Sequence, residues 1–319
     1  MIIGVSIMLF GMNLMSDSIQ KLADNKLEMY LYKLTDYKPK AVFFGFFSTA
    51  LVQSSAAISS LTVSFIDSSL IKLKQATQII LGAILGTSAT GFIIAFSSLG
   101  ASNRIADIFS AKTLIAVFCL FGIILKLIIK NSKTRKIGDI LLSFAVIMFG
   151  ITTISSESEQ LKNNVYINKI INDSSNEIIA LICGLGLSSL FQSASAAVGF
   201  IQSLSLTGLI SFNFSLNYLA GVMIGSSVPV LLFAAGKSKK SKQGAVMYLI
   251  INLIGALINM LGFMIIRNKT QNIILTSFDI AIINFIIRVV TLIAVYPLTD
   301  FIEERISKIN IKIISLKKE

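Results

Sequence analysis

Two clusters of amide and hydroxyl side chains interrupt long apolar stretches of this sequence. They read TALVQSSAAISS at 49–60 and SSLFQSASAAVGF at 188–200. Polar groups are costly in apolar surroundings, so these must face protein, water or a ligand. If each segment turns back at its glutamine, the N–H groups of the returning helix attract an anion, and serine is a preferred cap there. Carbonyls freed by the turn, together with hydroxyls, can replace the hydration shell of sodium.

A second pair of motifs follows, GAILGTSAT at 82–90 and GVMIGSSVP at 221–229. Each is a Gly-x-x-x-Gly pattern, which is typical of two helices that cross closely. Hydroxyl residues come directly after it, and Pro229 removes a backbone donor, which favours a local helix break. Carbonyls and hydroxyls at such a break can complete a cation site. The alternative to an ion or anion site is that the hydroxyl residues of both motif pairs serve only the close packing of helices.

The composition indicates that the elements carrying these motifs lie in a membrane. Of 319 residues, 54% are hydrophobic and only 14% are charged, and no soluble globule hides so much apolar surface. The sequence has no histidine and two cysteines, which excludes His-based triads, His/Cys zinc sites and disulfide frameworks. We see no nucleophile–base pair, so we expect a non-enzyme with no cofactor and no transition-metal site. Segments long enough to span or nearly span the bilayer lie at 2–20, 41–66, 75–97, 110–129, 138–155, 178–204, 215–235, 244–266 and 278–299.

The basic residues fix the expected topology and argue against a nucleic-acid partner. The net charge is +12, but the lysines and arginines fall in short clusters between apolar segments, as in cytoplasmic loops. If 41–66 and 178–204 dip into the membrane and return on the same side, the inner loops hold 20 basic residues and the outer loops hold 5. This arrangement predicts an outer N-terminus and a cytoplasmic C-terminus in the cell membrane. The basic tail 300–319 is expected along the lipid surface.

The chain also repeats itself at an offset of 139 residues. Gln53 corresponds to Gln192, Gly82 to Gly221, and ten of 41 positions are identical between 50–90 and 189–229. Three crossings per copy invert the second copy, and the five lysines of loop 21–40 against two in 160–179 agree with that. Inverted repeats are typical of secondary transporters with a site near the midplane. The predicted units are 1–138 with hairpin 41–66, 139–277 with hairpin 178–204, and 278–319 with a final transmembrane helix and the tail.

The paired motifs resemble the type II sodium/phosphate cotransporters and their bacterial relatives. That family combines a Gln-Ser-Ser-Ser hairpin motif with Gly-Ala-Asn-Ile-Gly-Thr-Thr in each of two inverted repeats. Here the hairpin motifs read Gln53-Ser54-Ser55-Ala56 and Gln192-Ser193-Ala194-Ser195. The resemblance covers about residues 1–265, including the opening GVSIMLFGMNLMSDSIQKLA and the late GKSKKSKQGAVMYLIINLIG. It implies sodium-coupled uptake of inorganic phosphate.

The sequence departs from the family pattern in three respects. Ala56 and Ala194 replace one hydroxyl of each serine triplet. Ile84 and Met223 stand where the family has asparagine, which removes two side-chain amides. A C-terminal domain resembling a phosphate-uptake regulator, frequent in bacterial relatives, is not present in this sequence.

The leading hypothesis is a symporter that moves phosphate with sodium by alternating access, with the lipid bilayer as its setting and a homo-oligomer left open. The phosphate-binding residues are predicted to be Gln53, Ser54, Ser55, Gln192, Ser193 and Ser195. The sodium-binding residues are predicted to be Thr87, Ser88, Ser226 and Ser227, with both glutamines. The alternatives are another small anion, or a non-transporting subunit that senses phosphate or acts as a scaffold. Arg288 lies deepest among the intramembrane charges and either pairs with Asp279, steers anions or is structural.

Overall fold

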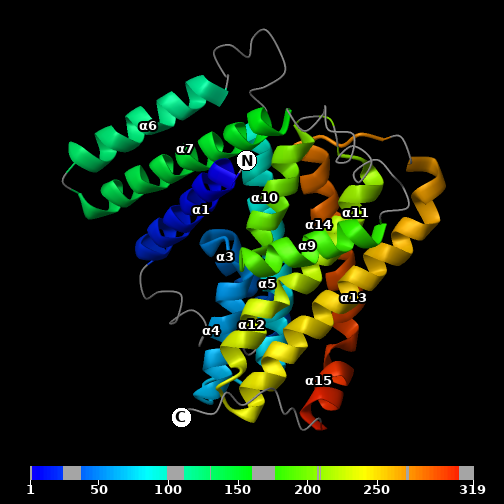
Figure 1. Ribbon diagram of the computed structural model, residues 1–319. Helices are drawn as coiled ribbons and strands as arrows, with labels where there is room; N and C mark the ends of the chain where they lie inside the picture. The colour runs from blue at the N-terminus through cyan, green and yellow to red at the C-terminus, as the bar shows by residue number, and fades with distance from the viewer. Residues whose placement is uncertain are drawn as a thin grey trace, which may run out of the picture.

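The structure is a computed structural model. It describes residues 2–23, 37–98, 111–129, 131–159, 177–206, 208, 210–270 and 273–308, and most of these residues are helical. Within it the helices (Figure 1) are α1 (Ile2–Ala23), α3 (Lys38–Val52), α4 (Ser55–Asp67), α5 (Leu73–Ser98), α6 (Ala111–Leu127), α7 (Ser132–Glu159), α9 (Glu177–Leu190), α10 (Ala194–Ser205), α11 (Phe212–Gly225), α12 (Ser227–Ala234), α13 (Lys239–Thr270), α14 (Ser277–Val295), the 3-10 helix η4 (Tyr296–Leu298) and α15 (Thr299–Lys308). An isolated antiparallel bridge joins Ser211 and Ile274. The all-α prediction is confirmed for these residues.

Five of the described helical spans are long and apolar enough to cross a membrane. They are Leu73–Phe96, Ser132–Ile154, Phe212–Ala234, Lys239–Ile265 and Ser277–Lys308, close to five of the predicted segments. The predicted segments 2–20 and 110–129 form α1 and α6, whose apolar parts are shorter. The two glutamine-containing segments are each split into a pair of short helices, α3–α4 and α9–α10.

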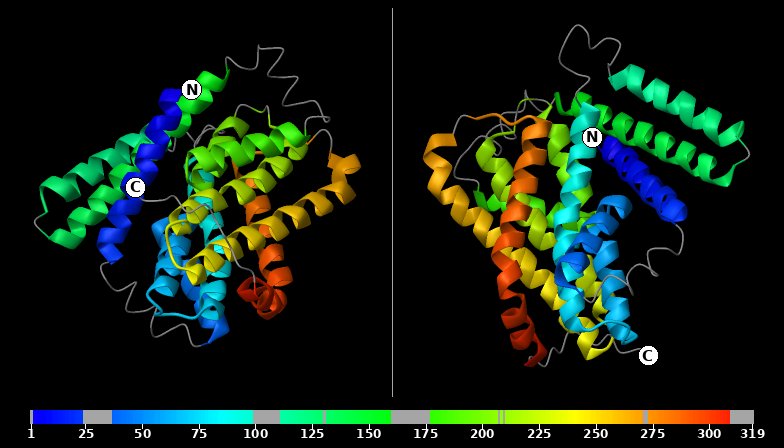
Figure 2. Two further views of the ribbon diagram at one scale, coloured as in Figure 1. Left: turned by 60° about the horizontal axis from the view of Figure 1, so that its bottom comes forward. Right: turned by 180° about the vertical axis from the view of Figure 1, so that it is seen from behind.

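Helices α1, α6 and α7 form a layer beside the rest of the molecule (Figures 1 and 2). Glycines allow their backbones to approach. A Cβ added at Gly4 would lie 2.8 Å from the backbone nitrogen of Ile154, and one added at Gly122 would lie 2.7 Å from the side chain of Leu142. Buried residues of α1 and α7 pack with Ile94 of α5 and Ala196 of α10. This contact joins the layer to the remaining helices.

The α3–α5 crossing is repeated by the α9–α11 crossing, residue for residue. A Cβ at Gly45 would collide with the carbonyl oxygen of Ile79, and 139 positions later a Cβ at Gly184 would collide with that of Tyr218. Gly82 meets the carbonyl of Val42, and its counterpart Gly221 meets that of Leu181. The Gly-x-x-x-Gly motifs therefore do make close helix crossings, as their pattern predicts.

Polar contacts gather the ends of several helices at one end of the molecule, the lower end in Figure 1. Asp300 of α15 binds Lys38 at 2.8 Å and Lys74 at 3.0 Å. Asp67, the last residue of α4, accepts from the backbone N–H of Ser238 at 3.1 Å and lies 3.5 Å from Lys237. Gln243 donates to the carbonyl of Ile306 at 3.2 Å. The start of α3 and the end of α4 thus both lie at this end of the molecule.

The start of α11 lies at a different place, next to the start of α14. The backbone N–H of Phe212 donates to the carbonyl of Ile273 at 2.9 Å, and that of Leu275 donates to Ile210 at 3.1 Å. The glycine contacts make α9 run parallel to α11, just as α3 runs parallel to α5. Residues 210–212 and the start of α14 are therefore neighbours.

Candidate functional site

Each glutamine of the QS motifs forms the turn between two short helices. Helix α3 ends at Val52, and Gln53 adopts the left-handed conformation with a φ of 57°. Gln192 follows α9 with a φ of 52°. A non-glycine residue in this region is uncommon and marks a constrained turn. The prediction that both segments break at the glutamine is confirmed.

The serine after each glutamine caps the returning helix. The Ser54 hydroxyl accepts from the backbone N–H of Ala57 at 3.1 Å, and the Ser193 hydroxyl accepts from Ala196 at 3.2 Å. Each cap satisfies one of the free N–H groups of the first helical turn. The other N–H groups of α4 and α10 give both turns a partial positive charge.

The two turns differ in their exposure. Gln53 is buried, and inside the described part of the chain neither its amide nitrogen nor its amide oxygen has a hydrogen-bond partner. Gln192 is exposed. A buried amide without partners is rare, because it loses its hydrogen bonds to water and receives nothing in return. Only the first turn therefore holds a buried, unpartnered amide.

More unpartnered hydroxyls lie where α3 crosses α5. A Cβ added at Gly86 would lie 2.8 Å from the Cβ of Thr49. Gln53 follows Thr49 at the end of α3, and Thr90 lies one turn after Gly86 in α5. The hydroxyls of Thr49 and Thr90 are buried, and neither has a partner among the described residues. Several polar atoms in one small region of the interior are thus left for a ligand, an ion or water.

The two QS motifs meet through a direct hydrogen bond. The Ser195 hydroxyl of α10 donates to the backbone carbonyl of Gln53 at 3.1 Å, and both residues are buried. This contact joins positions 142 residues apart. The prediction that residues from both motifs lie together is supported for this pair.

A tyrosine that the sequence reading missed connects the first QS motif to the second glycine motif. The Tyr248 hydroxyl of α13 lies 3.1 Å from that of Ser55 and donates to that of Ser226 at 3.4 Å. Asn252, one turn later, donates to the Ser227 hydroxyl at 3.4 Å. The spacing of Tyr248 and Asn252, four apart in an apolar segment, is the signal that could have revealed them.

The four predicted sodium-binding hydroxyls are all buried, but their surroundings differ. Thr87 and Ser88 donate to carbonyls of their own helix, Ala83 at 3.2 Å and Leu85 at 2.6 Å. Helix α5 continues through them without a break. In the second copy the helix is interrupted at Ser226, between α11 and α12. The predicted break therefore exists only in the copy that carries Pro229.

Of the charged residues in the apolar segments, Asp279 and Lys126 lie in the terminal turns of their helices, whereas Asp17 and Asp139 lie further inside theirs. Asp279 caps α14, accepting from the hydroxyl of Thr276 at 2.7 Å, so the alternative in which it pairs with Arg288 is wrong. Lys126 binds Asp139 at 2.7 Å between α6 and α7. Asp17 is exposed, and the side chain of Lys112 lies outside the described set. Within the described residues, no group of three acidic or cysteine side chains could hold a metal ion.

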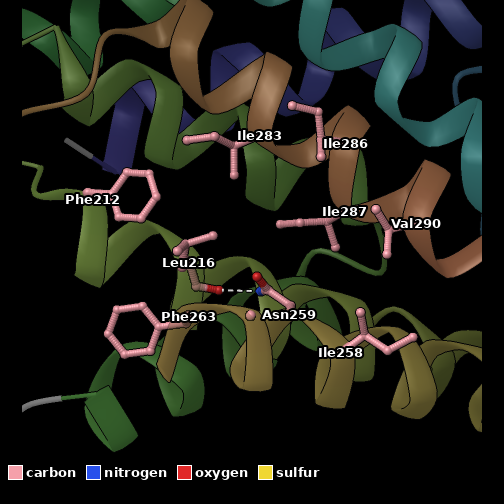
Figure 3. Close-up of a pocket in the computed structure, with 10 residues that line it drawn as sticks. Phe212, Leu216, Ile258, Asn259, Phe263, Ile283, Ile286, Ile287 and Val290 are labelled. Carbon is pink, nitrogen blue, oxygen red and sulfur yellow. Dashed lines mark hydrogen bonds between the residues drawn. The ribbon is translucent and has the colours of Figure 1, made fainter. Parts of the chain in front are cut away.

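An apolar cavity of about 340 Å³ lies apart from these polar groups (Figure 3). It lies between α11, α13 and α14, where Phe212, Phe263 and Ile287 line it. The polar residue of its lining, Asn259, is already hydrogen-bonded, because its amide nitrogen donates to the carbonyl of Leu216 at 2.7 Å. Such a lining suits a hydrocarbon chain and offers nothing to an anion.

The N-terminal part of the chain matches a known family, and several curated proteins are similar over most of the chain. Residues 7–156 match the family described as Na+/Pi-cotransporter. The uncharacterized protein YqeW of Bacillus subtilis is 23% identical over 250 residues, 77% of this chain and 76% of its own length. The putative inorganic phosphate export protein YjbB of Escherichia coli is 25% identical over 256 residues.

The coverage of these relatives is uneven. The match takes in 80% of this chain but only 45% of YjbB. The human sodium-dependent phosphate transport protein 2B is 39% identical over 69 residues, which are 22% of this chain and 10% of that protein. No solved structure is significantly similar to the chain.

The helical spans and the family match agree on a multi-pass membrane protein. The resemblance read from the QS and glycine motifs is confirmed, because residues 7–156 match the model of the family described as Na+/Pi-cotransporter.

Proposed function

We propose that the chain is a sodium-coupled secondary transporter of inorganic phosphate that works by alternating access. The observation that carries the proposal is the meeting of the two QS motifs, in which Ser195 donates to the Gln53 carbonyl beside an unpartnered buried amide. An anion needs donors, and the Gln53 amide, the serine hydroxyls and two helix N-termini supply them. The phosphate site is proposed to comprise Gln53, Ser54, Ser55, Gln192, Ser193 and Ser195.

The proposed sodium sites use the hydroxyls beside these turns. Ser226 and Ser227 lie at a helix break, where carbonyl oxygens become available to a cation. Thr87 and Ser88 stand at the corresponding positions of α5, and both glutamine carbonyl oxygens complete the set. Sodium has a second role, because it offsets the charge of the bound phosphate.

The proposed architecture consists of two inverted repeats, 1–138 and 139–277, followed by 278–319. The glycine contacts between α3 and α5 recur between α9 and α11 at one constant offset in the sequence, and this supports the repeat. The α3–α4 pair has both ends near Asp300 and Lys237, whereas α9 starts where α11 starts. This supports two re-entrant hairpins that enter from opposite sides. In this arrangement the N-terminus lies outside and the C-terminus in the cytoplasm.

Transport by purified protein in liposomes tests the proposal. An inward sodium gradient should drive radiolabelled phosphate into the vesicles, and a potassium gradient should not. Sulfate offered in place of phosphate distinguishes the same fold with another anion. Phosphate binding without any transport would instead support a sensing or scaffold subunit.

Export is the second candidate, since YjbB is named as a phosphate export protein. A symporter moves its substrate in whichever direction the coupled gradient points. Vesicles preloaded with phosphate and given an outward sodium gradient should therefore release it. Release that ignores the sodium gradient would favour export by another mechanism.

A further inference from the structure

Arg288 is the largest fully buried side chain of the described residues. It lies on α14 in the interior of a candidate membrane span, and only 2% of its surface is exposed. Its Nε donates to the side-chain oxygen of Asn284 at 3.1 Å, and its Nη1 donates to the backbone carbonyl of Ile84 at 2.9 Å. Both partners are neutral.

The charge of this guanidinium is not balanced. None of the ion pairs found among the described residues includes Arg288. Its Nη2 is buried and has no hydrogen-bond partner there. A buried arginine is normally paired, because an isolated charge in low dielectric is very costly. Among the described residues, Arg288 thus combines a buried positive charge with an unpartnered Nη2, and no carboxylate pairs with it.

Arg288 also lies close to the groups of the candidate site. The residue whose carbonyl it binds, Ile84, packs with Ala56 and Tyr248 in one buried cluster. Ala56 follows Ser55, and the Tyr248 hydroxyl contacts Ser55 and Ser226. Helices α5 and α13 therefore connect the guanidinium to the first QS motif and to the second glycine motif.

We propose that Arg288 is the fixed counter-charge of the anion site and selects for multiply charged tetrahedral oxyanions such as phosphate. This inference rests on the proposed function. Phosphate at neutral pH carries between one and two negative charges, and two helix N-termini offset only about one. A guanidinium fork matches the oxygens of phosphate and stays charged in a buried site. Without substrate, the same charge repels sodium and so favours joint binding.

Calorimetric titration of the full chain in nanodiscs with inorganic phosphate and, separately, with sodium tests the inference. Arg288→Gln should weaken phosphate binding in sodium by about tenfold or more. The same variant should bind sodium more tightly than the wild type when phosphate is absent. Arg288→Lys, which keeps the charge and loses the fork, should stay within about tenfold of the wild-type phosphate affinity.

Arg305→Gln is the matched control, because it removes the same charge at an exposed position. It should leave both affinities unchanged. Equal phosphate affinity in the wild type and Arg288→Gln would overturn the counter-charge role and leave the proposed function standing. A wild type that binds no phosphate would overturn both. If Arg288→Gln does not fold, the lysine variant decides, since a folded Arg288→Lys that binds no phosphate contradicts a role for the charge.

Discussion

The α3–α4 and α9–α10 pairs have the same local geometry, but they are held differently. In both, a glutamine in the left-handed conformation is followed by a serine cap. The first turn is buried and its pair is tied by Asp67 and by Lys38 to neighbouring helices, whereas Gln192 is exposed. Leu206, the counterpart of Asp67, cannot bind a cation. The local turn thus follows from the motif, and its burial follows from what the flanking residues attach to.

This difference has a direct meaning for alternating access. A transporter with two equivalent hairpins must expose its site to one side at a time. Under the proposed function, the buried Gln53 turn and the exposed Gln192 turn would correspond to one such state. The two turns therefore either contribute equally to the proposed site, or one of them carries it.

The largest effect is expected from replacing the turn glutamines. Gln53→Ala and Gln192→Ala should each abolish sodium-driven phosphate uptake in proteoliposomes, because each amide supplies donors and an acceptor to the proposed anion site. Each loss is expected to cost about 1–3 kcal/mol of binding, roughly tenfold to a hundredfold in affinity.

The relative size of the two losses shows whether one turn or both turns bind the ligand. Equal losses would mean that Gln192 reaches the ligand during the cycle although it is exposed here. A loss confined to Gln53→Ala would mean that the buried turn alone binds. Normal transport by both folded variants would contradict the site.

Sodium should raise phosphate affinity by about tenfold or more, and phosphate should raise sodium affinity by the same factor, because binding linkage is reciprocal. The helix break exists only at Ser226, so Ser226→Ala should reduce this factor more than Ser88→Ala does. Calorimetry with choline replacing sodium at constant ionic strength measures it. Identical phosphate affinity in both media would remove the case for sodium.

The sequence predicted the helical class, the glycine crossings and the position of both turns, since each depends on local chemistry. Left-handed glutamines followed by serine caps need only a few residues in a row. It did not predict that Gln53 is buried while Gln192 is exposed, or that Tyr248 links Ser55 to Ser226. Those facts depend on how α13 packs against α4, and no local pattern encodes that packing.

The glycine crossings test whether the two copies are equally packed. Gly45→Ala and Gly184→Ala each place a methyl group against a backbone carbonyl. Overpacking of this kind typically costs about 1–3 kcal/mol, and the thermal melting temperature in detergent should fall for both. Gly186→Ala is the control from the same helix, because an added Cβ there meets nothing within 4 Å. A melting temperature that falls equally for Gly186→Ala would show that the loss does not come from the crossing.

The smallest effect should come from Asp67, which ties the end of α4 to the start of α13. Hydrogen bonds from Ser238, followed by one from Ser241 and the charge of Lys237, lower the pKa of Asp67 from 3.8 to about 2. A lowered pKa means that the carboxylate stabilises the fold above its unfolded pKa of 3.8, and that this contribution is lost as the pH falls through about 2. Asp67→Asn should therefore lower the melting temperature slightly and by a constant amount from pH 5 to pH 8, with the difference shrinking below the unfolded pKa. Because Leu206 offers no equivalent charge, Leu206→Ala should show no such pH dependence. A difference between wild type and Asp67→Asn that changes between pH 5 and pH 8 would show that another group titrates with this contact, and the simple tether would then be wrong.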